Sequence, residues 1–252
     1  MAHFQMGNDL LLLAENAARK AGEMLKSQEA KVLSSIGKDV KLDVDMEAHK
    51  FLLQKLGATG IPILSEEDGV HEFDKKKQWV IDPLDGSLNF SRGIPISVVS
   101  IALMEDGEPK LGVIYDFNRD EMFTGVVGEG AWLNGKPIFV SGVKEKGEAI
   151  LMSGFPSHSD QSSEALQNFI SRVQVFKKVR LFGSAALSLA YVACGRADAY
   201  FEKGIYIWDV AAGLALVKAA GGVHTKTSID KYGKCTTYAS SNISLQDEIG
   251  DK

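Results

Sequence analysis

Near the start of the chain, five apolar residues recur at the spacing of a helix: Leu10, Leu13, Ala17, Ala21 and Leu25. They predict an amphipathic helix that Asn8 or Asp9 could cap. A polar stretch around residues 34–37 follows this helix. A second helix is then predicted from about Asp45 to Leu56, and Gly57 would end it.

Short apolar runs separated by turn residues predict strands in the next part of the chain. Residues 61–64 and 78–81 are predicted as buried strands, and acidic residues follow each of them. Three more strands are predicted at residues 96–105, 110–117 and 121–127. Because Asp106-Gly107 and residues 118–120 supply turns, these three strands should form an antiparallel meander. The glycine-rich stretch 128–137 is predicted as a tight surface loop.

Strands and helices alternate in the second half, in the predicted order strand 149–153, helix 162–173, strand 178–182, helix 184–194, strand 197–202, helix 208–220 and strand 222–225. No linker, repeat or change of composition divides the chain. We therefore predict an α/β (α+β) protein in which residues 1–252 form a single domain, with two sheet regions layered between helices.

Composition narrows the class of protein. The chain has 252 residues, 45% of them hydrophobic and 24% charged, as is typical of a globular domain. Because the formal net charge is −5, we expect neither nucleic acid nor a membrane surface as its partner, and an anionic substrate would need a local positive centre such as a metal ion. Two unpaired cysteines, Cys194 and Cys235, argue against a zinc or disulfide scaffold. With no apolar stretch of membrane-spanning length and no evident secretory signal, the expected location is the cytoplasm.

Four carboxylates stand where apolar segments meet polar turns: Glu66, Asp82, Asp85 and Asp209. Glu66 and Asp82 each follow a predicted strand, and Asp209 opens a predicted helix. Carboxylate and carbonyl oxygens are the ligands that Mg²⁺ prefers in proteins. These positions therefore make the chain a candidate metal-dependent enzyme.

The hexapeptide 82–87 combines several of these features. Pro83 should end the strand at Asp82, and Gly86 lets the chain turn so that both aspartates face one point. Ser87 could cap a following helix, whose free amides could hold a phosphate oxygen. Taken alone, the motif favours an ordinary polar turn after a strand. A calcium loop is excluded because Leu84 and Gly86 occupy positions that would need oxygen ligands.

A longer stretch, WVIDPLDGSLNFSRGIP at residues 79–95, resembles the inositol monophosphatase family of the lithium-sensitive, magnesium-dependent phosphatase superfamily. Four further segments match that family in the expected order: Ser65–Glu67, Gly183–Ala185, Ala197–Glu202 and Trp208–Gly213. The resemblance covers nearly the whole chain. It implies a layered αβαβα sandwich assembled as a homodimer.

The resemblance also assigns roles to individual residues. It implies two or three Mg²⁺ ions, with Mn²⁺ as a possible substitute, held by Glu66, Asp82, the Leu84 carbonyl, Asp85 and Asp209. It implies a catalytic set that activates water: Glu66, Asp45 and Ser87. The substrate would be bound by Asp85, Gly86, Ser87, Gly183, Ser184, Ala185, Glu202 and Asp209.

Two departures from the family pattern affect the catalytic set. Ser87 stands where the family usually has threonine, so the hydroxyl is kept but its rotamer is less restrained. The segment 38–45 lacks the threonines common in the mobile early loop of the family, in which Asp39 and Asp45 match acidic positions. The assignment of a third metal ion depends on this loop.

The predicted function is hydrolysis of a phosphate monoester by activated water, without a phosphoenzyme. Inositol 1-phosphate is the expected substrate. Fructose 1,6-bisphosphate, alone or as a second activity, is an alternative because residues 179–184 resemble dual-activity archaeal-type enzymes, and Arg92 or Arg180 could reach a second phosphate. A further alternative is a regulatory, transcription-associated binding protein, since some bacterial relatives assist transcription complexes.

Overall fold

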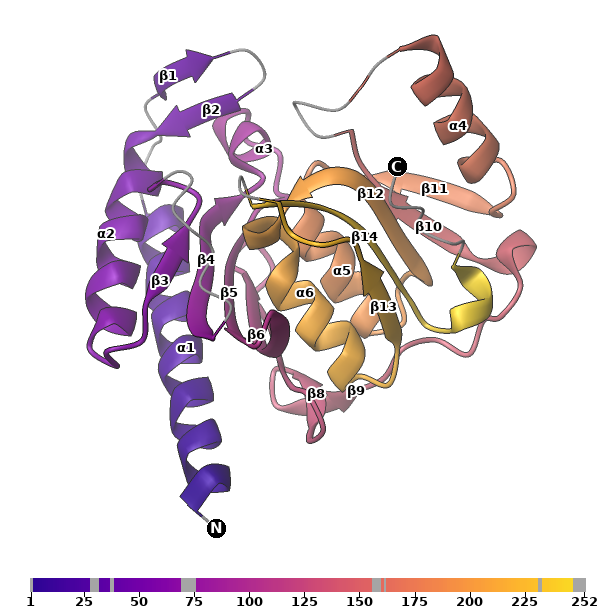
Figure 1. Cartoon of the computed structure of the whole chain (residues 1–252). Coiled ribbons are helices and arrows are strands. Elements are labelled where there is room, and N and C mark those ends of the chain that lie inside the picture. Colours follow the sequence, from indigo (N-terminus) through magenta and orange to yellow (C-terminus); the bar gives the residue numbers. More distant parts are fainter. Residues whose placement is uncertain are drawn as a thin grey trace.

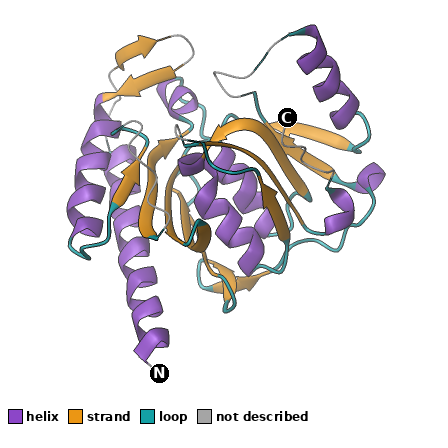
Figure 2. Ribbon diagram, viewed as in Figure 1, coloured by secondary structure: helices purple, strands orange, loops and turns teal. Residues whose placement is uncertain are grey.

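The computed structural model describes residues 2–27, 32–36, 39–68, 76–155, 160, 162–230 and 233–246, with the side chains of residues 2–8 and 32–42 outside the description. Two large sheets alternate with layers of helices (Figure 1). The same order of helix and sheet layers is visible when the ribbon is coloured by secondary structure (Figure 2). This arrangement confirms the predicted layered α/β class.

The larger sheet has seven strands in sequence order: β3 (Ile63–Ser65), β4 (Lys77–Asp85), β5 (Val98–Glu105), β6 (Glu108–Asp116), β7 (Glu121–Val126), β8 (Gly130–Leu133) and β9 (Lys136–Ile138). β3 and β4 are parallel, and every later neighbour is antiparallel. The predicted meander is therefore present as β5, β6 and β7. Parallel pairing of β3 and β4 brings their C-terminal ends, which precede Glu66 and carry Asp82, to the same edge of the sheet.

Helices α1 (Ala2–Lys26) and α2 (Asp43–Gly57) cover one face of this sheet (Figure 1). Because side chains alternate along β4, Trp79 and Ile81 pack against these helices while Val80 faces the opposite layer. A two-stranded hairpin of β1 (Val32–Ile36) and β2 (Asp39–Leu42) connects α1 and α2. Both helices were predicted, and α1 buries the predicted apolar residues Ala17, Ala21 and Leu25.

The central layer consists of α5 (Ala185–Ala193) and α6 (Ile207–Ala219), which lie between the two sheets (Figure 1). Eight of the nine residues of α5 are buried, and only Asp209, Ala219 and the solvent-facing Lys218 of α6 are not. A helix that is apolar all round is expected where both faces are covered. This burial fixes Asp209, in the first turn of α6, with little freedom to move.

The smaller sheet has five strands in the order β11 (Lys178–Leu181), β10 (Ile150–Ser153), β12 (Ala199–Tyr206), β14 (Lys234–Ser240) and β13 (Val223–Lys226). Its outer face carries a separate apolar cluster that includes Leu151 and Phe201. Helix α4 (Ser163–Val173) lies beyond this sheet (Figure 1). None of the described helices combines the length and apolar character needed to cross a bilayer.

Several predicted boundaries were wrong. α1 begins at Ala2 and not after a cap at Asn8 or Asp9. The expected surface loop 128–137 contains β8 and β9, joined by a tight turn in which Asn134 and Gly135 both have positive φ (48° and 76°). The polar stretch after α1 contains a hairpin strand, and β14 was not expected at all.

Candidate metal and substrate site

Three of the predicted carboxylates meet at one point. Glu66 follows β3, Asp82 lies on β4 and Asp209 is in the first turn of α6, and one carboxylate oxygen from each lies within 4.8 Å of the others. Glu66 and Asp209 are 143 positions apart in the sequence. The predicted gathering of distant acidic side chains is therefore present.

The local geometry of β4 turns Asp82 and Asp85 into the site. The Asp82 Oδ1 atom accepts a hydrogen bond from the Leu84 main-chain nitrogen at 2.9 Å. The pairing of β4 with β5 shifts register between Asp82 and Asp85, which marks a bulge. The expectation that Pro83 ends the strand was wrong, because β4 continues through the bulge to Asp85.

Asp85 is held by the N-terminus of α5. Its Oδ2 atom accepts hydrogen bonds from the Ser184 hydroxyl and from the Ala186 main-chain nitrogen, both at 2.7 Å. Burial raises the pKa of Asp85 to about 6, although these donors favour the ionised form. The fixed carboxylate keeps its other oxygen for a different partner.

Gly86 makes the sharp turn that follows. It has φ 88° and ψ 34°, which only glycine adopts without strain, and it caps α3 (Ser87–Ser91). A side chain here would place Cβ 2.6 Å from the Ile96 carbonyl oxygen. The expected role of Ser87 as the cap was wrong, since Ser87 is the first residue inside the helix.

The strain at Gly86 can be measured. We expect Gly86→Ala to lower the free energy of unfolding by roughly 2 kcal/mol or more, because it combines a left-handed backbone with a main-chain clash. Gly57→Ala is the matched control, since nothing lies within 4 Å of its Cβ position and its φ is not positive. Urea denaturation of both variants measures the effect, and equal stability of the two would contradict it.

The carboxylates strongly affect one another. The pKa of Asp82 is raised by burial and then by the charges of Glu66, Asp85, Asp209 and Asp45. Burial and neighbouring carboxylates also raise the pKa of Asp209, whose Oδ2 atom accepts a hydrogen bond from the Tyr206 nitrogen at 3.3 Å. Like charges in a buried site favour a cation that compensates them.

A cavity of about 200 Å³ opens beside this cluster. It is lined by Asp85, Ser153, Gly154, Phe155, Gly183, Ser184, Ala185, Ser188, Glu202, Ile205 and Asp209. The predicted substrate residues Gly183, Ser184, Ala185 and Glu202 all line it. The cavity and the carboxylate cluster share Asp209, so a molecule in the cavity would touch both.

Glu202 is buried at the wall of this cavity. Its Oε2 atom accepts a hydrogen bond from the Tyr200 hydroxyl at 2.6 Å, and burial, with a contribution from the charge of Asp85, raises its pKa to about 7. Gly154 makes room for the carboxylate, because a Cβ there would lie 2.9 Å from both Glu202 oxygens. The contact with Tyr200 was not foreseen, although the two residues are two positions apart on one strand face.

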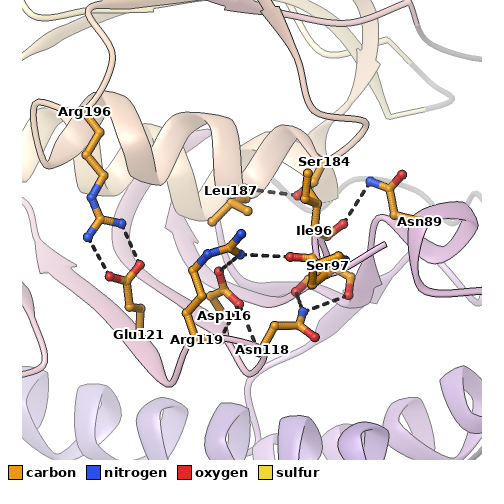
Figure 3. Close-up of polar contacts among 11 residues, drawn as sticks. Asn89, Ile96, Ser97, Asp116, Asn118, Arg119, Glu121, Ser184, Leu187 and Arg196 are labelled. Atoms are coloured by element: carbon orange, nitrogen blue, oxygen red, sulfur yellow. Dashed lines mark hydrogen bonds and ion pairs between the residues drawn. The ribbon is translucent and has the colours of Figure 1, made fainter. Parts of the chain in front are cut away.

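Ser184 lines the cavity and also has a structural role that the sequence did not predict. Its hydroxyl donates to Asp85. It also accepts from the Leu187 nitrogen at 3.3 Å and so caps α5; Figure 3 shows this second contact. The side chain thus links the helix to a carboxylate of the site. Nothing in the sequence predicts this contact, because 99 positions separate the two residues.

The remaining predicted residues whose side chains are described lie outside the carboxylate cluster and the lining of the cavity. Asp45 is buried in the first turn of α2, and its charge reaches Asp82, whereas the side chain of Asp39 lies outside the described residues. Arg180 lies on the exposed edge strand β11 and donates to the Val179 carbonyl, and neither it nor Arg92 lines the cavity. Arg172, which the sequence did not indicate, lines a second cavity that adjoins the first.

The donor set fits a hard divalent cation. Every candidate ligand in the described cluster is a carboxylate oxygen, with no cysteine or histidine among them. Such oxygens suit Mg²⁺ or Mn²⁺ and would not select zinc or copper. Asp82 is buried, whereas Glu66 and Asp209 are not fully buried. Repulsion among the three carboxylates favours binding of a cation that neutralises them.

Two sheets layered between helices, with buried carboxylates at a sheet edge, define a layered α/β protein with a candidate metal centre. A profile of the Inositol monophosphatase family matches residues 8–249, and the chain belongs to this family. Nus factor SuhB of Xylella fastidiosa is 44% identical over 214 residues, which are 82% of this chain and 78% of that protein.

Similar solved structures also indicate the inositol monophosphatase fold. The inositol monophosphatase of Anabaena (Nostoc) has a TM-score of 0.82 at 34% identity, covering 94% of this chain and 92% of its own. The extragenic suppressor protein suhB of Bartonella henselae has a TM-score of 0.82 at 31% identity, covering 96% and 100%. The predicted family and fold are confirmed. The family binds phosphate esters and depends on Mg²⁺.

Proposed function

We propose that this protein is a Mg²⁺-dependent phosphate monoester hydrolase whose main substrate is inositol 1-phosphate. The observation that carries the proposal is the convergence of Glu66, Asp82 and Asp209 beside a cavity of about 200 Å³. Family membership supports the same reaction. The similarity to a solved inositol monophosphatase supports the choice of substrate.

Different residues of the site would bind the metal ions, bind the phosphate and orient the attacking water. Glu66, Asp82, Asp85, Asp209 and the Leu84 carbonyl would hold two Mg²⁺ ions, with a third depending on Asp45. Mg²⁺, when bound, lowers the pKa of a water molecule and neutralises charge on the phosphate and the leaving oxygen. The main-chain N–H groups of Gly86 and Ser87 would hold phosphate oxygens. Glu66, with Asp45 and the Ser87 hydroxyl, would orient the attacking water.

The alcohol part of the substrate would occupy the cavity. Glu202 and Asp209 offer carboxylate oxygens to its hydroxyl groups, and the Ala185 main chain lies on the same wall. Binding the alcohol in this position places the ester bond against the carboxylate cluster. Holding both reactants in place contributes a large part of the rate.

A substrate panel tests the proposal directly. We expect phosphate release from inositol 1-phosphate that is lost with EDTA and restored by Mg²⁺, and much weaker release from 3′-phosphoadenosine 5′-phosphate. Full activity in EDTA, or no release from any ester of the panel with Mg²⁺ present, would refute it. Malachite-green detection of phosphate is sufficient as the readout.

A second cavity favours fructose 1,6-bisphosphate as an additional substrate. It measures about 590 Å³ and shares Ser153, Gly154, Phe155 and Glu202 with the first cavity. Its lining adds two cationic residues, Arg172 and Lys203, while no cation lines the first cavity. Arg172 lies with its guanidinium carbon 3.9 Å from the centre of the Phe201 ring. These cations could bind a second phosphate.

Arg172→Ala separates the two substrates. We expect it to lower kcat/KM for fructose 1,6-bisphosphate about tenfold or more, since a charge-assisted bond contributes about 1.5–3 kcal/mol, and to leave inositol 1-phosphate within about twofold. Arg180→Ala is the control, because Arg180 lines neither cavity. An equal loss for both substrates would contradict a second phosphate site.

The name of the relative, Nus factor SuhB, favours another candidate function, a transcription-associated binding partner. It runs against our expectation from net charge that nucleic acid is not a partner. Co-purification of RNA polymerase or ribosomal RNA with the tagged protein would support this role. A role in transcription alone would not account for the convergence of the acidic side chains, so we rank this function below hydrolysis.

We also propose that residues 1–252 form one domain and that the chain forms a homodimer. One apolar cluster joins residues of both large sheets to α5 and α6, which supports a single domain. Helix α4 has no buried residue, and its Leu166 and Ile170 are 42% and 51% exposed, which supports a covering partner. Sedimentation equilibrium measures the mass in solution.

A further inference from the structure

The side-chain amide of Asn89 joins three segments at the site. Asn89 lies on α3, and its Nδ2 atom is 2.9 Å from the Ile96 carbonyl oxygen, 2.8 Å from that of Phe182 and 3.3 Å from that of Gly183. Figure 3 shows the bond to Ile96. Because the amide has two hydrogens, the two shorter contacts are full hydrogen bonds and the third is shared. One side chain thus connects segments 93 positions apart.

The backbone around Asn89 is shaped for this contact. The Asn89 carbonyl accepts from the Arg92 and Ile94 nitrogens, at 3.1 and 2.9 Å, which folds the chain back toward Ile96. Gly183 has φ 68°, and a Cβ there would lie 3.2 Å from Asn89 Nδ2. A larger residue at Gly183 would therefore be strained by the positive φ and would press against the Asn89 amide.

The segment that Asn89 holds also fixes Asp85. Phe182 and Gly183 lead directly into Ser184, whose hydroxyl donates to Asp85 at 2.7 Å. The Ala186 nitrogen donates to the same oxygen at 2.7 Å. Any shift of this turn would move both donors together, and so change the direction of the Asp85 carboxylate.

We propose that Asn89 is a positioning residue, which sets the N-terminus of α5 against Asp85 and thereby the orientation of that carboxylate in the metal site. This inference rests on the proposed function. It assigns no contact between Asn89 and the substrate or the metal. Partners that hydrogen-bond a metal ligand, as Ser184 does Asp85, typically change metal affinity or activity 10–100-fold when they are removed, and Asn89 acts through this partner.

Asn89→Ala tests the proposal against Asn118→Ala. Asn118 is a matched control, because its Nδ2 atom donates to the carbonyl and hydroxyl of the neighbouring Ser97, at 3.2 and 3.4 Å, without contact to α5 (Figure 3). We expect Asn89→Ala to weaken Mg²⁺ binding in calorimetry and to lower kcat, each about 10–100-fold, at temperatures where both variants are fully folded. Asn118→Ala should lose stability only.

A double variant tests the route through Ser184. If Asn89 acts by placing the Ser184 hydroxyl on Asp85, then Asn89→Ala combined with Ser184→Ala should lose little more Mg²⁺ affinity than the worse single variant. Losses that multiply would overturn the route. The milder Asn89→Ser keeps one donor and should fall between wild type and Asn89→Ala.

The outcomes separate this inference from the proposed function. Equal Mg²⁺ affinity and kcat in Asn89→Ala, Asn118→Ala and wild type would overturn the role of Asn89. Absence of turnover in the wild type would refute the proposed function instead. In that case the Mg²⁺ dissociation constants would still decide the inference, because they require no catalysis.

Discussion

Asp85→Asn is expected to reduce kcat/KM for inositol 1-phosphate by roughly 10³-fold while the protein stays folded. The amide oxygen can still accept from Ser184 and Ala186, so the local structure survives. Under the proposed function, the change would remove one negative ligand of the metal. A bound metal would supply several kcal/mol of charge stabilisation in the transition state, and each ~1.4 kcal/mol is tenfold in rate. Steady-state kinetics at saturating Mg²⁺ measure the loss.

The control for this change is Asp120→Asn. Asp120 is an exposed acid that pairs with Arg19 and Tyr115 outside the cluster, so its loss should leave kcat/KM unchanged. Circular dichroism of both variants establishes that they are folded. Near-normal turnover in folded Asp85→Asn would remove Asp85 from the metal site.

The second prediction with a large effect concerns thermal stability. We expect Mg²⁺ to raise the Tm of the protein, and to raise it more at higher pH. Burial raises the folded-state pKa of Asp85 to about 6 and of Glu202 to about 7, and the pKa values of Asp82 and Asp209 are also raised. In the unfolded chain these groups titrate near pH 4. Between these values the folded, metal-free protein binds more protons, so these groups cost stability as pH rises from about 4 to 7.

Under the proposed function, Mg²⁺ would reverse this loss by binding the ionised carboxylates. At 100 times its dissociation constant, a ligand stabilises by about 2.7 kcal/mol, or roughly 5–10 °C in Tm for a chain of this size. We expect an increase of this order at pH 8 and a much smaller one at pH 5, where the ligands must first lose protons. Differential scanning calorimetry with and without Mg²⁺ gives both values.

The increase in Tm caused by Mg²⁺ is compared at each pH, because groups outside the site contribute equally with and without Mg²⁺ and therefore cancel. Burial lowers the pKa of His224 to about 4, so this residue favours the folded state as pH rises through 4 to 6.5, equally with and without Mg²⁺. Asp209→Asn should abolish the Mg²⁺ increment and raise the Tm of the metal-free protein at pH 8. Equal increments at pH 5 and pH 8 would argue against a binding site made of these carboxylates.

Local sequence patterns were sufficient for much of the fold. The apolar spacing predicted α1, Gly57 predicted the end of α2, and the turn residues predicted the meander of β5, β6 and β7. The error at residues 128–137 arose because glycines were taken to indicate a loop. The pair Asn134-Gly135 is the usual signal of a two-residue hairpin turn and could have predicted β8 and β9.

For the candidate site, features set by the local sequence could be predicted, whereas contacts between distant segments could not. The strand end before Glu66 could be located from the sequence, whereas the strand of Asp82 continues to Asp85. The family motifs indicated that the two carboxylates converge. The support around them could not be predicted. The bonds of Ser184 to Asp85 and of Asn89 to Phe182 join residues more than 90 positions apart, and no local pattern specifies such contacts.

The most direct test of the metal centre is the anomalous difference map of a crystal grown with Mn²⁺, which takes the same oxygen ligands as Mg²⁺. The account predicts at least one strong peak among the carboxylate oxygens of Glu66, Asp82 and Asp209. A map with no peak there, or with those side chains turned away from one another, would contradict it.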